Sequence, residues 1–435
     1  MKKLIFGFAA AFLFLTCTSC FGTKNFNTAE NYNDNTLAVP EQSGAVSSVP
    51  ETSNTYNTID EGDKAKLDAL EADAVKAMQL SQDVYAAADK GTSVNVTLSK
   101  ETVNEIVSAI GAGGYSVIDY DGNLNMQNPE AMMALGEAVN AGRDAEASYF
   151  TVQSDGRISE NVISFVSGSG TEIAMSLEWN EKMEPIVYDA GQYALSDIKY
   201  TDKGWLIFNR DITNFHINKK FNVDSHTLVR ISPYDETSRK LCQKYIEPVG
   251  YSENNLFTST WSESDYGALD FNCLFPILYG AYYDIDSLTF YSANEKFDLI
   301  SGTNMQLIPK DDFERVIDNF FDINSNELRN LADYSESQEG YFMLGYQTGY
   351  YDVAPRLPTP EVVDYWYNAD GTLTLKVDAI FPWYGTDRAF THELTIRIIG
   401  GGFQYVSNYL YENEGNILPD CKLAPERERE INGIE

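Results

Sequence analysis

Histidine is scarce in this chain, and the usual catalytic signatures are missing. The three histidines stand at positions 216, 226 and 392 of a 435-residue sequence. They are too few and too scattered for a zinc site, whose ligands normally follow each other at short spacings. No G-x-S-x-G precedes a helical pattern, and the S-x-x-K match at Ser196–Lys199 lies in an alternating strand without its partner motifs. We therefore expect a core or edge role for His392 and no recognisable hydrolase centre.

Cysteine is also rare, which excludes a disulfide framework. Of the five cysteines, Cys17 and Cys20 lie near the N-terminus, so the body of the chain keeps Cys242, Cys273 and Cys421. One bridge among these three remains open if the protein is exported. We expect isolated buried thiols, with Cys242 on a buried helix face.

Basic residues are too few to balance the acidic ones. The chain has 31 Lys and Arg against 65 Asp and Glu, a formal charge of −34 at pH 7. A field of this sign repels phosphate backbones and anionic lipid head groups, so nucleic acid is excluded as a partner. The same charge favours a soluble body and could attract divalent cations.

Long apolar runs are absent except for one at the N-terminus. Residues 4–15 are apolar and follow Lys2 and Lys3. This run is shorter than the roughly 20 residues that a membrane-spanning helix needs, and small residues and Cys20 follow it. The pattern predicts a signal peptide over 1–19 and lipidation of Cys20 by acyl chains such as palmitate, although Cys17 stands where a lipobox usually has Leu. Plain secretion and a retained anchor are the alternatives.

The predicted localisation is therefore the cell membrane, with the protein lipid-anchored on the extracellular face. Residues 20–58 are rich in Asn, Thr, Ser and Pro and have few large aliphatic side chains. This composition predicts a disordered tether. The pattern beyond it predicts an N-terminal domain over 59–232, a C-terminal domain over 233–425 and a charged tail over 426–435.

The N-terminal unit combines helical and strand patterns. Apolar residues recur at helical spacing from Leu67 to Ala88, and further helices are expected after Ser99 and over 129–143. A short strand is expected at Val94–Leu98. From Tyr149 onward, apolar and polar residues alternate between Gly-containing turns, which predicts an antiparallel meander of four to six strands. Helices followed by hairpins indicate an α+β domain.

The C-terminal unit follows a joint at residues 231–233. Helices are expected from Ser238, from about Lys310 and after an Asn326 cap. Asn368–Gly371 predicts a tight hairpin turn, and the odd-numbered residues 373–381 share one strand face. The sequence thus predicts two α+β units built on antiparallel sheets with segregated helices. It contains no internal repeat.

Three stretches of the chain match a known family: EPVGYSENNLF, PTPEVVDYWYNADGTLTLKVDAIFPWYGTDRAFTHELT and FQYVSNYL. In them the chain resembles an uncharacterised family of lipoproteins from anaerobic Gram-positive bacteria, over about residues 95–425. The resemblance implies a surface lipoprotein of unknown function and supplies no catalytic residues.

The loop DYDGNLNMQNPE offers one candidate metal site. Oxygen-bearing side chains alternate along it with the spacing of a helix-loop-helix calcium loop. The candidate ligands are Asp119, Asp121, Asn123, Asn125, Gln127 and Glu130. Leu124 occupies the position where such loops have Gly, and the preceding segment is not helical. The alternative is a strand and turn leading into a helix that begins at Glu130.

Clusters of aromatic residues offer a candidate ligand surface. Rings beside carboxylates and amides can stack on sugars while the polar groups bind hydroxyls. The residues considered are Tyr365, Trp366, Tyr367, Trp383 and Tyr384, with further pairs at 282–283 and 350–351.

The composition favours a non-catalytic envelope binding or interaction module. Possible partners are a cell-wall glycan or an envelope protein. One alternative is a glycan- or peptidoglycan-active hydrolase using unrecognised carboxylates. The other is an accessory lipoprotein of a transporter or sensor.

Overall fold

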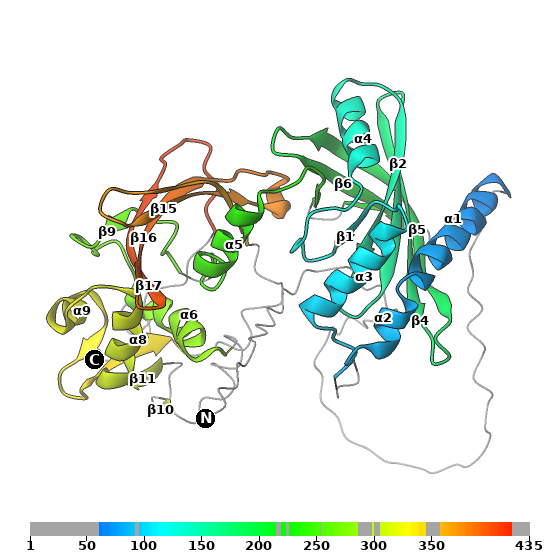
Figure 1. Cartoon of the computed structure of the whole chain (residues 1–435). Coiled ribbons are helices and arrows are strands. Elements are labelled where there is room, and N and C mark those ends of the chain that lie inside the picture. Colours follow the sequence, from blue (N-terminus) through cyan, green and yellow to red (C-terminus); the bar gives the residue numbers. More distant parts are fainter. Residues whose placement is uncertain are drawn as a thin grey trace, which may run out of the picture.

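The chain is described by a computed structural model, which defines residues 61–91, 95–214, 219–222, 226–252, 254–285, 298–299, 305–344 and 357–419. The fold is α+β, with three sheets of mostly antiparallel strands (Figure 1). The predicted signal peptide, Cys20, tether and charged tail lie outside the described residues, as do His216, Cys421 and Tyr350–Tyr351. No helix in the described part is long and apolar enough to cross a membrane.

The largest sheet contains eight strands in the order β1-β2-β3-β4-β5-β6-β7, with β8 also paired to β6. The strands are β1 (Val117–Asp119), β2 (Ala145–Val152), β3 (Ile158–Val166), β4 (Ser169–Trp179), β5 (Pro185–Tyr200), β6 (Trp205–Asn214), β7 (Lys219–Asn222) and β8 (Thr227–Arg230). The antiparallel meander is confirmed in β2 to β6. The sheet is nevertheless mixed, because β1 pairs with β2 in parallel. Helix α4 (Glu130–Asn140) lies between these two strands in the chain and provides the crossover.

Helices cover both faces of this sheet. The neighbouring residues Tyr149 and Phe150 of β2 point to opposite sides and join different hydrophobic clusters. Phe150 packs with helices α1 (Glu61–Gln79), α2 (Gln82–Ala87) and α3 (Lys100–Ala112), whereas Tyr149 packs with α4. Helix α4 contacts both β2 and β5, so the sheet is curled around it.

Two local predictions for this unit need correction. The expected long helix is divided into α1 and α2, which meet at Leu80 and Ser81. The expected strand at Val94–Leu98 is not formed in its described part, residues 95–98, although the Leu98 amide donates to the Ser154 carbonyl. The Ser99 cap is confirmed, because its hydroxyl accepts from the Thr102 amide at 3.2 Å.

Among the described residues, the remaining elements form two smaller sheets, four α-helices and one short 3₁₀ helix. One sheet has the order β10-β11-β13-β12 and the other the order β14-β15-β16-β17-β9. The strands are β9 (Trp261–Ser262), β10 (Asp298–Leu299), β11 (Met305–Pro309), β12 (Tyr334–Ser335), β13 (Gly340–Leu344), β14 (Thr359–Tyr367), β15 (Leu373–Ile380), β16 (Thr391–Ile399) and β17 (Gly402–Leu410). The helices are α5 (Glu236–Tyr245), α6 (Phe271–Tyr283), α8 (Lys310–Phe320), α9 (Ser325–Leu331) and the short η1 (Pro382–Tyr384).

Two predicted helix starts in this part are shifted. Helix α5 is capped by Asp235, which accepts from the Ser238 amide, rather than beginning at Ser238. Helix α9 is capped by Asn324 instead of Asn326. The helix at Lys310 and the hairpin turn at Asn368–Gly371 are as predicted.

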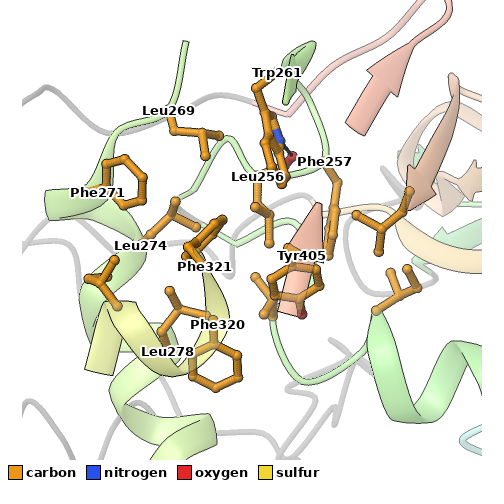
Figure 2. Packing of buried hydrophobic residues seen from close by; sticks show 14 of the residues in the cluster. Leu256, Phe257, Trp261, Leu269, Phe271, Leu274, Leu278, Phe320, Phe321 and Tyr405 are labelled. Atoms are coloured by element: carbon orange, nitrogen blue, oxygen red, sulfur yellow. Dashed lines mark hydrogen bonds between the residues drawn. The ribbon is translucent and has the colours of Figure 1, made fainter. Parts of the chain in front are cut away.

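A single aromatic-rich core lies between the five-stranded sheet and the helices. Figure 2 shows Phe320, Phe321 and Tyr405 meeting side chains from α6 and from the segment that ends at Trp261. His392 is buried in this core, as expected. Its Nδ1 lies 2.7 Å from Asn408 Oδ1 and its Nε2 lies 3.0 Å from the Tyr251 hydroxyl. Burial lowers the pKa of His392 to about 4, so the ring is neutral and has a structural role.

Cys242 agrees with the expectation of an isolated buried thiol. Cys242 is buried on α5, and burial raises its pKa well above the ordinary value. Cys273 is partly buried. A thiol held in its neutral form is a poor nucleophile, which agrees with a structural role for Cys242.

Candidate functional site

The predicted calcium loop follows β1 and is closed by its own hydrogen bonds. The Asp119 side chain is buried at the end of this strand. Its Oδ2 accepts from the Asn123 amide and its Oδ1 from the Leu124 amide, both at 2.8 Å. This carboxylate therefore organises the turn as an acceptor of backbone hydrogen bonds.

The other candidate ligands of this loop have separate environments. Asn125 accepts from the Tyr234 amide at 2.8 Å and donates to the Tyr234 carbonyl at 2.9 Å. Glu130 is exposed and begins α4. No group of three or more His, Cys, Asp or Glu side chains within the described ranges is placed to hold a metal ion. The calcium site stays a prediction. In the described geometry the loop contacts residues 230–239, a segment that we call the joint because it lies between the two predicted units.

That joint is built around Tyr234. The Arg230 and Arg239 guanidinium groups lie 5.0 and 5.1 Å from the centre of its ring, and its hydroxyl donates to the Val362 carbonyl of β14. Arg239 also donates to the Gly122 carbonyl of the loop at 2.7 Å. Cation–π contacts and hydrogen bonds thus connect the loop, the segment from Arg230 to Arg239 and β14.

Two buried carboxylates complete the joint. Glu361 and Asp378 are direct partners across β14 and β15 and point to the same face. Glu361 is paired with Arg230 and accepts from Trp205 Nε1 at 3.0 Å. Asp378 is paired with Lys203 and, at 3.0 Å, with Arg388.

These ion pairs weigh against an acid catalyst at the joint. Burial alone would raise the pKa of Asp378, but hydrogen bonds from Lys203 and Thr391 outweigh burial and lower it. A glycoside hydrolase needs one carboxylic acid whose pKa is raised. Asp378 therefore has the electrostatics of a structural ion pair.

Beyond the joint, the same face of the five-stranded sheet is open. We call it the outer face and define it by Asp364, Trp366, Lys376, Glu393, Tyr409 and Tyr411. Direct cross-strand partners share a face, and one row runs Asp364–Lys376–Glu393–Tyr409 from β14 to β17. Trp366 lies in the row on one side of it, with Thr374, Thr395 and Ser407. Tyr411 lies on the other side, where its amide donates to the Thr391 carbonyl.

The aromatic rings of the outer face are accessible. The exposed fractions are 37% for Trp366, 53% for Tyr409 and 36% for Tyr411. Trp366 and Tyr409 are three strand spacings apart and lie in neighbouring rows, which places their Cα atoms about 16 Å from each other. The face between them carries threonine and serine hydroxyls, a carboxylate and an ammonium group.

Polar contacts hold the Tyr411 side of this face in place. The Tyr411 hydroxyl lies 2.5 Å from Glu393 Oε1, and the Lys376 ammonium group lies 5.1 Å from the centre of the Tyr411 ring. The Tyr409 and Tyr411 rings meet edge to face with centroids 5.1 Å apart. The hydrogen bond to Glu393 raises the pKa of Tyr411, so this hydroxyl keeps its proton.

The five predicted aromatic residues do not form one surface. Trp366 is on the outer face, but Tyr365 packs partly buried against the core on the opposite side of the sheet. Tyr367 is 68% exposed at the hairpin end of β14. Trp383 and Tyr384 belong to η1, which follows the other end of the same hairpin. At the rise per residue of a strand, this end lies about 25 Å from Tyr367.

Sequence reasoning missed Tyr409, Tyr411, Lys376 and Glu393 as members of the site. Their alternation within β15, β16 and β17 was readable, since Lys376 alternates with the buried Leu375 and Val377. The alternation does not reveal which strands are neighbours, so the connection between Trp366 and Tyr409 required the sheet order.

Comparison with known proteins gives a family but no activity. No curated protein and no solved structure matches the chain. Residues 68–423, which include most of the described part of the chain, match the family described as "Family of unknown function (DUF6070)". The chain therefore belongs to this family of unknown function.

Proposed function

We propose that this chain is a lipid-anchored protein of the extracellular membrane face that binds a glycan through the outer face of its five-stranded sheet. The observation that carries the proposal is the placement of Trp366, Tyr409 and Tyr411 on one open face. Flat rings stack on the C–H faces of sugars, and polar groups between the rings accept and donate hydrogen bonds to hydroxyls. The spacing of the rings exceeds one sugar ring and favours a chain of several.

Three further features support a binding role at the cell envelope. The apolar N-terminal run and Cys20 favour export and lipidation, and the resemblance to lipoproteins of Gram-positive bacteria agrees with them. The charge of −34 favours a hydrated surface beside an anionic envelope. The buried carboxylates at the joint are engaged in ion pairs, which supports binding rather than hydrolysis.

The proposal is tested by co-sedimentation of the purified protein with insoluble cell-wall glycan, cellulose and chitin. We expect Trp366→Ala and Tyr409→Ala each to weaken binding about tenfold, the effect of losing one ring contact worth about 1.4 kcal/mol. Tyr188→Ala is the matched control, because this ring is also about half exposed but lies on β5. Equal binding of all three variants and the wild type would overturn the proposal.

A further inference from the structure

The outer face combines stacking rings with a row of charged side chains in which carboxylates outnumber cations. Arg388 is bonded to Asp378, and Arg397 is held by two hydrogen bonds to Glu263. Within the described row from β14 to β17, Lys376 is the one cation, and it stands between Asp364 and Glu393. This row carries one more negative than positive charge. Two exposed carboxylates, Glu412 and Glu414, follow Tyr411 directly.

Glu393 is the carboxylate best placed to contact a ligand on the rings. It is the direct cross-strand partner of Tyr409, so their Cα atoms lie about 4.5–5.5 Å apart and their side chains share a face. The Tyr411 hydroxyl fixes one oxygen, Oε1. The other oxygen, Oε2, accepts no hydrogen bond from any described residue.

We infer that the outer face selects glycans with free amino groups, and that Glu393 is the residue that determines this specificity. A sugar stacked on Tyr409 places its substituents next to Glu393 Oε2. An ammonium substituent gives a charge-assisted hydrogen bond there, which is roughly twice as strong as a neutral one. An acetamido group carries no charge, and a carboxylate or phosphate is repelled. The inference rests on the proposed function, since it names the class of glycan that the same face binds.

Titration calorimetry with two soluble oligosaccharides of equal length tests the inference. One is a chitosan oligosaccharide, with free amino groups, and the other is its fully N-acetylated counterpart. We expect the wild type to bind the chitosan oligosaccharide about tenfold more tightly at low salt and slightly acidic pH, and to lose most of this preference at high salt.

The variants separate specificity from stacking and from bulk charge. Glu393→Gln should reduce the preference for the chitosan oligosaccharide to about threefold or less, because an amide accepts only neutral hydrogen bonds. Trp366→Ala should weaken both ligands equally. Glu105→Gln is the charge control, since it removes the same charge from an exposed site on α3. Melting curves of the variants confirm that each is folded.

Each outcome decides between the two proposals. Equal affinity of the wild type for both oligosaccharides would overturn the specificity inference and leave glycan binding intact. The same loss of preference in Glu105→Gln as in Glu393→Gln would also overturn it, because attraction by the net charge would then suffice. Binding of neither these oligosaccharides nor any insoluble glycan would overturn the proposed function itself.

Discussion

At the scale of single residues, Glu160 is notable as a buried carboxyl group with an unsatisfied oxygen. It is 3% exposed on β3, and its Oε2 has no hydrogen-bond partner among the described residues. Burial, and next the charge of Asp73 on α1, raise its pKa from 4.5 to about 8. Glu160 is therefore mostly protonated at neutral pH, and ionising it requires burying an unpaired charge.

This pKa shift predicts a pH dependence of stability. Because the folded pKa is raised, the native state is favoured most below pH 4.5, and this contribution is lost as the pH rises to about 8. We expect Glu160→Gln to stabilise the protein by roughly 2 kcal/mol at pH 8 and to have little effect at pH 5. Urea unfolding at the two pH values measures this, with the exposed Glu105→Gln as control. A mutant whose stability has the wild-type pH slope would show that Glu160 ionises freely.

Asp119 gives a second prediction at this scale. Its carboxylate accepts backbone hydrogen bonds from Asn123 and Leu124, so its removal leaves two amides of the loop without an acceptor. We expect Asp119→Ala to destabilise the protein by about 1–3 kcal/mol, with or without calcium. Thermal unfolding in Ca²⁺ and in EDTA measures both effects. A wild-type melting temperature that rises with Ca²⁺ and falls in EDTA would instead support the predicted calcium site.

At the scale of elements, the sequence predicts what depends on neighbouring residues. The helix after Ser99 and the hairpin at Asn368–Gly371 follow from capping and turn chemistry, which act over a few residues. The strand face from Leu373 to Ala379 follows from alternation. Where two caps compete, as at Asp235 and Ser238, the pattern cannot decide, because both residue types can cap a helix.

Pairings between distant strands are not readable in the same way. The three residues of β1 are too few to show any period, and their parallel pairing with β2 depends on how α4 packs. The candidate site likewise depends on pairings between strands. Trp366 was predicted as a ligand-binding residue, but only the sheet order β14-β15-β16-β17 shows that Tyr409 lies on the same face.

The packing of α4 gives a prediction for an element. A Cβ atom at Gly136 would lie 2.6 Å from the Tyr200 ring, whose hydroxyl is hydrogen-bonded to Ser232 at 2.6 Å. Although alanine favours helices, we expect Gly136→Ala to destabilise the protein by about 1–3 kcal/mol, because the ring must shift. Urea unfolding measures the change. The control is Ser108→Ala at an exposed position of α3. Gly142→Ala is unsuitable, because Gly142 has a positive φ that alanine rarely adopts. A neutral or stabilising Gly136→Ala would show that α4 can move away from β5.

At the scale of the whole molecule, an ion pair at the joint connects two of the sheets. Glu361 of β14 is buried and paired with Arg230 of β8, and these strands belong to different sheets. We expect Arg230→Met to destabilise the protein by about 3–5 kcal/mol, because it leaves a buried carboxylate without its cation. Limited proteolysis should then cut near residues 231–235. The double variant Arg230→Met/Glu361→Met should recover part of the loss, and a double variant as unstable as the single one would show that the pair itself is not responsible.

The anchor also belongs to the scale of the whole molecule. The apolar run of residues 4–15 is too short to hold the protein stably in a membrane, so the predicted attachment depends on acyl chains on Cys20. We expect Cys20→Ala to release the protein from the membrane and to abolish labelling by a fatty-acid analogue. Cys17→Ala is the matched control, because Cys17 lies within the predicted signal peptide and should leave the labelling intact. The proposed glycan binding does not depend on the anchor, so the released Cys20→Ala protein should still sediment with glycan. Equal labelling of Cys20→Ala and the wild type would rule out Cys20 as the lipidated residue, while glycan binding would remain to be judged on Trp366 and Tyr409.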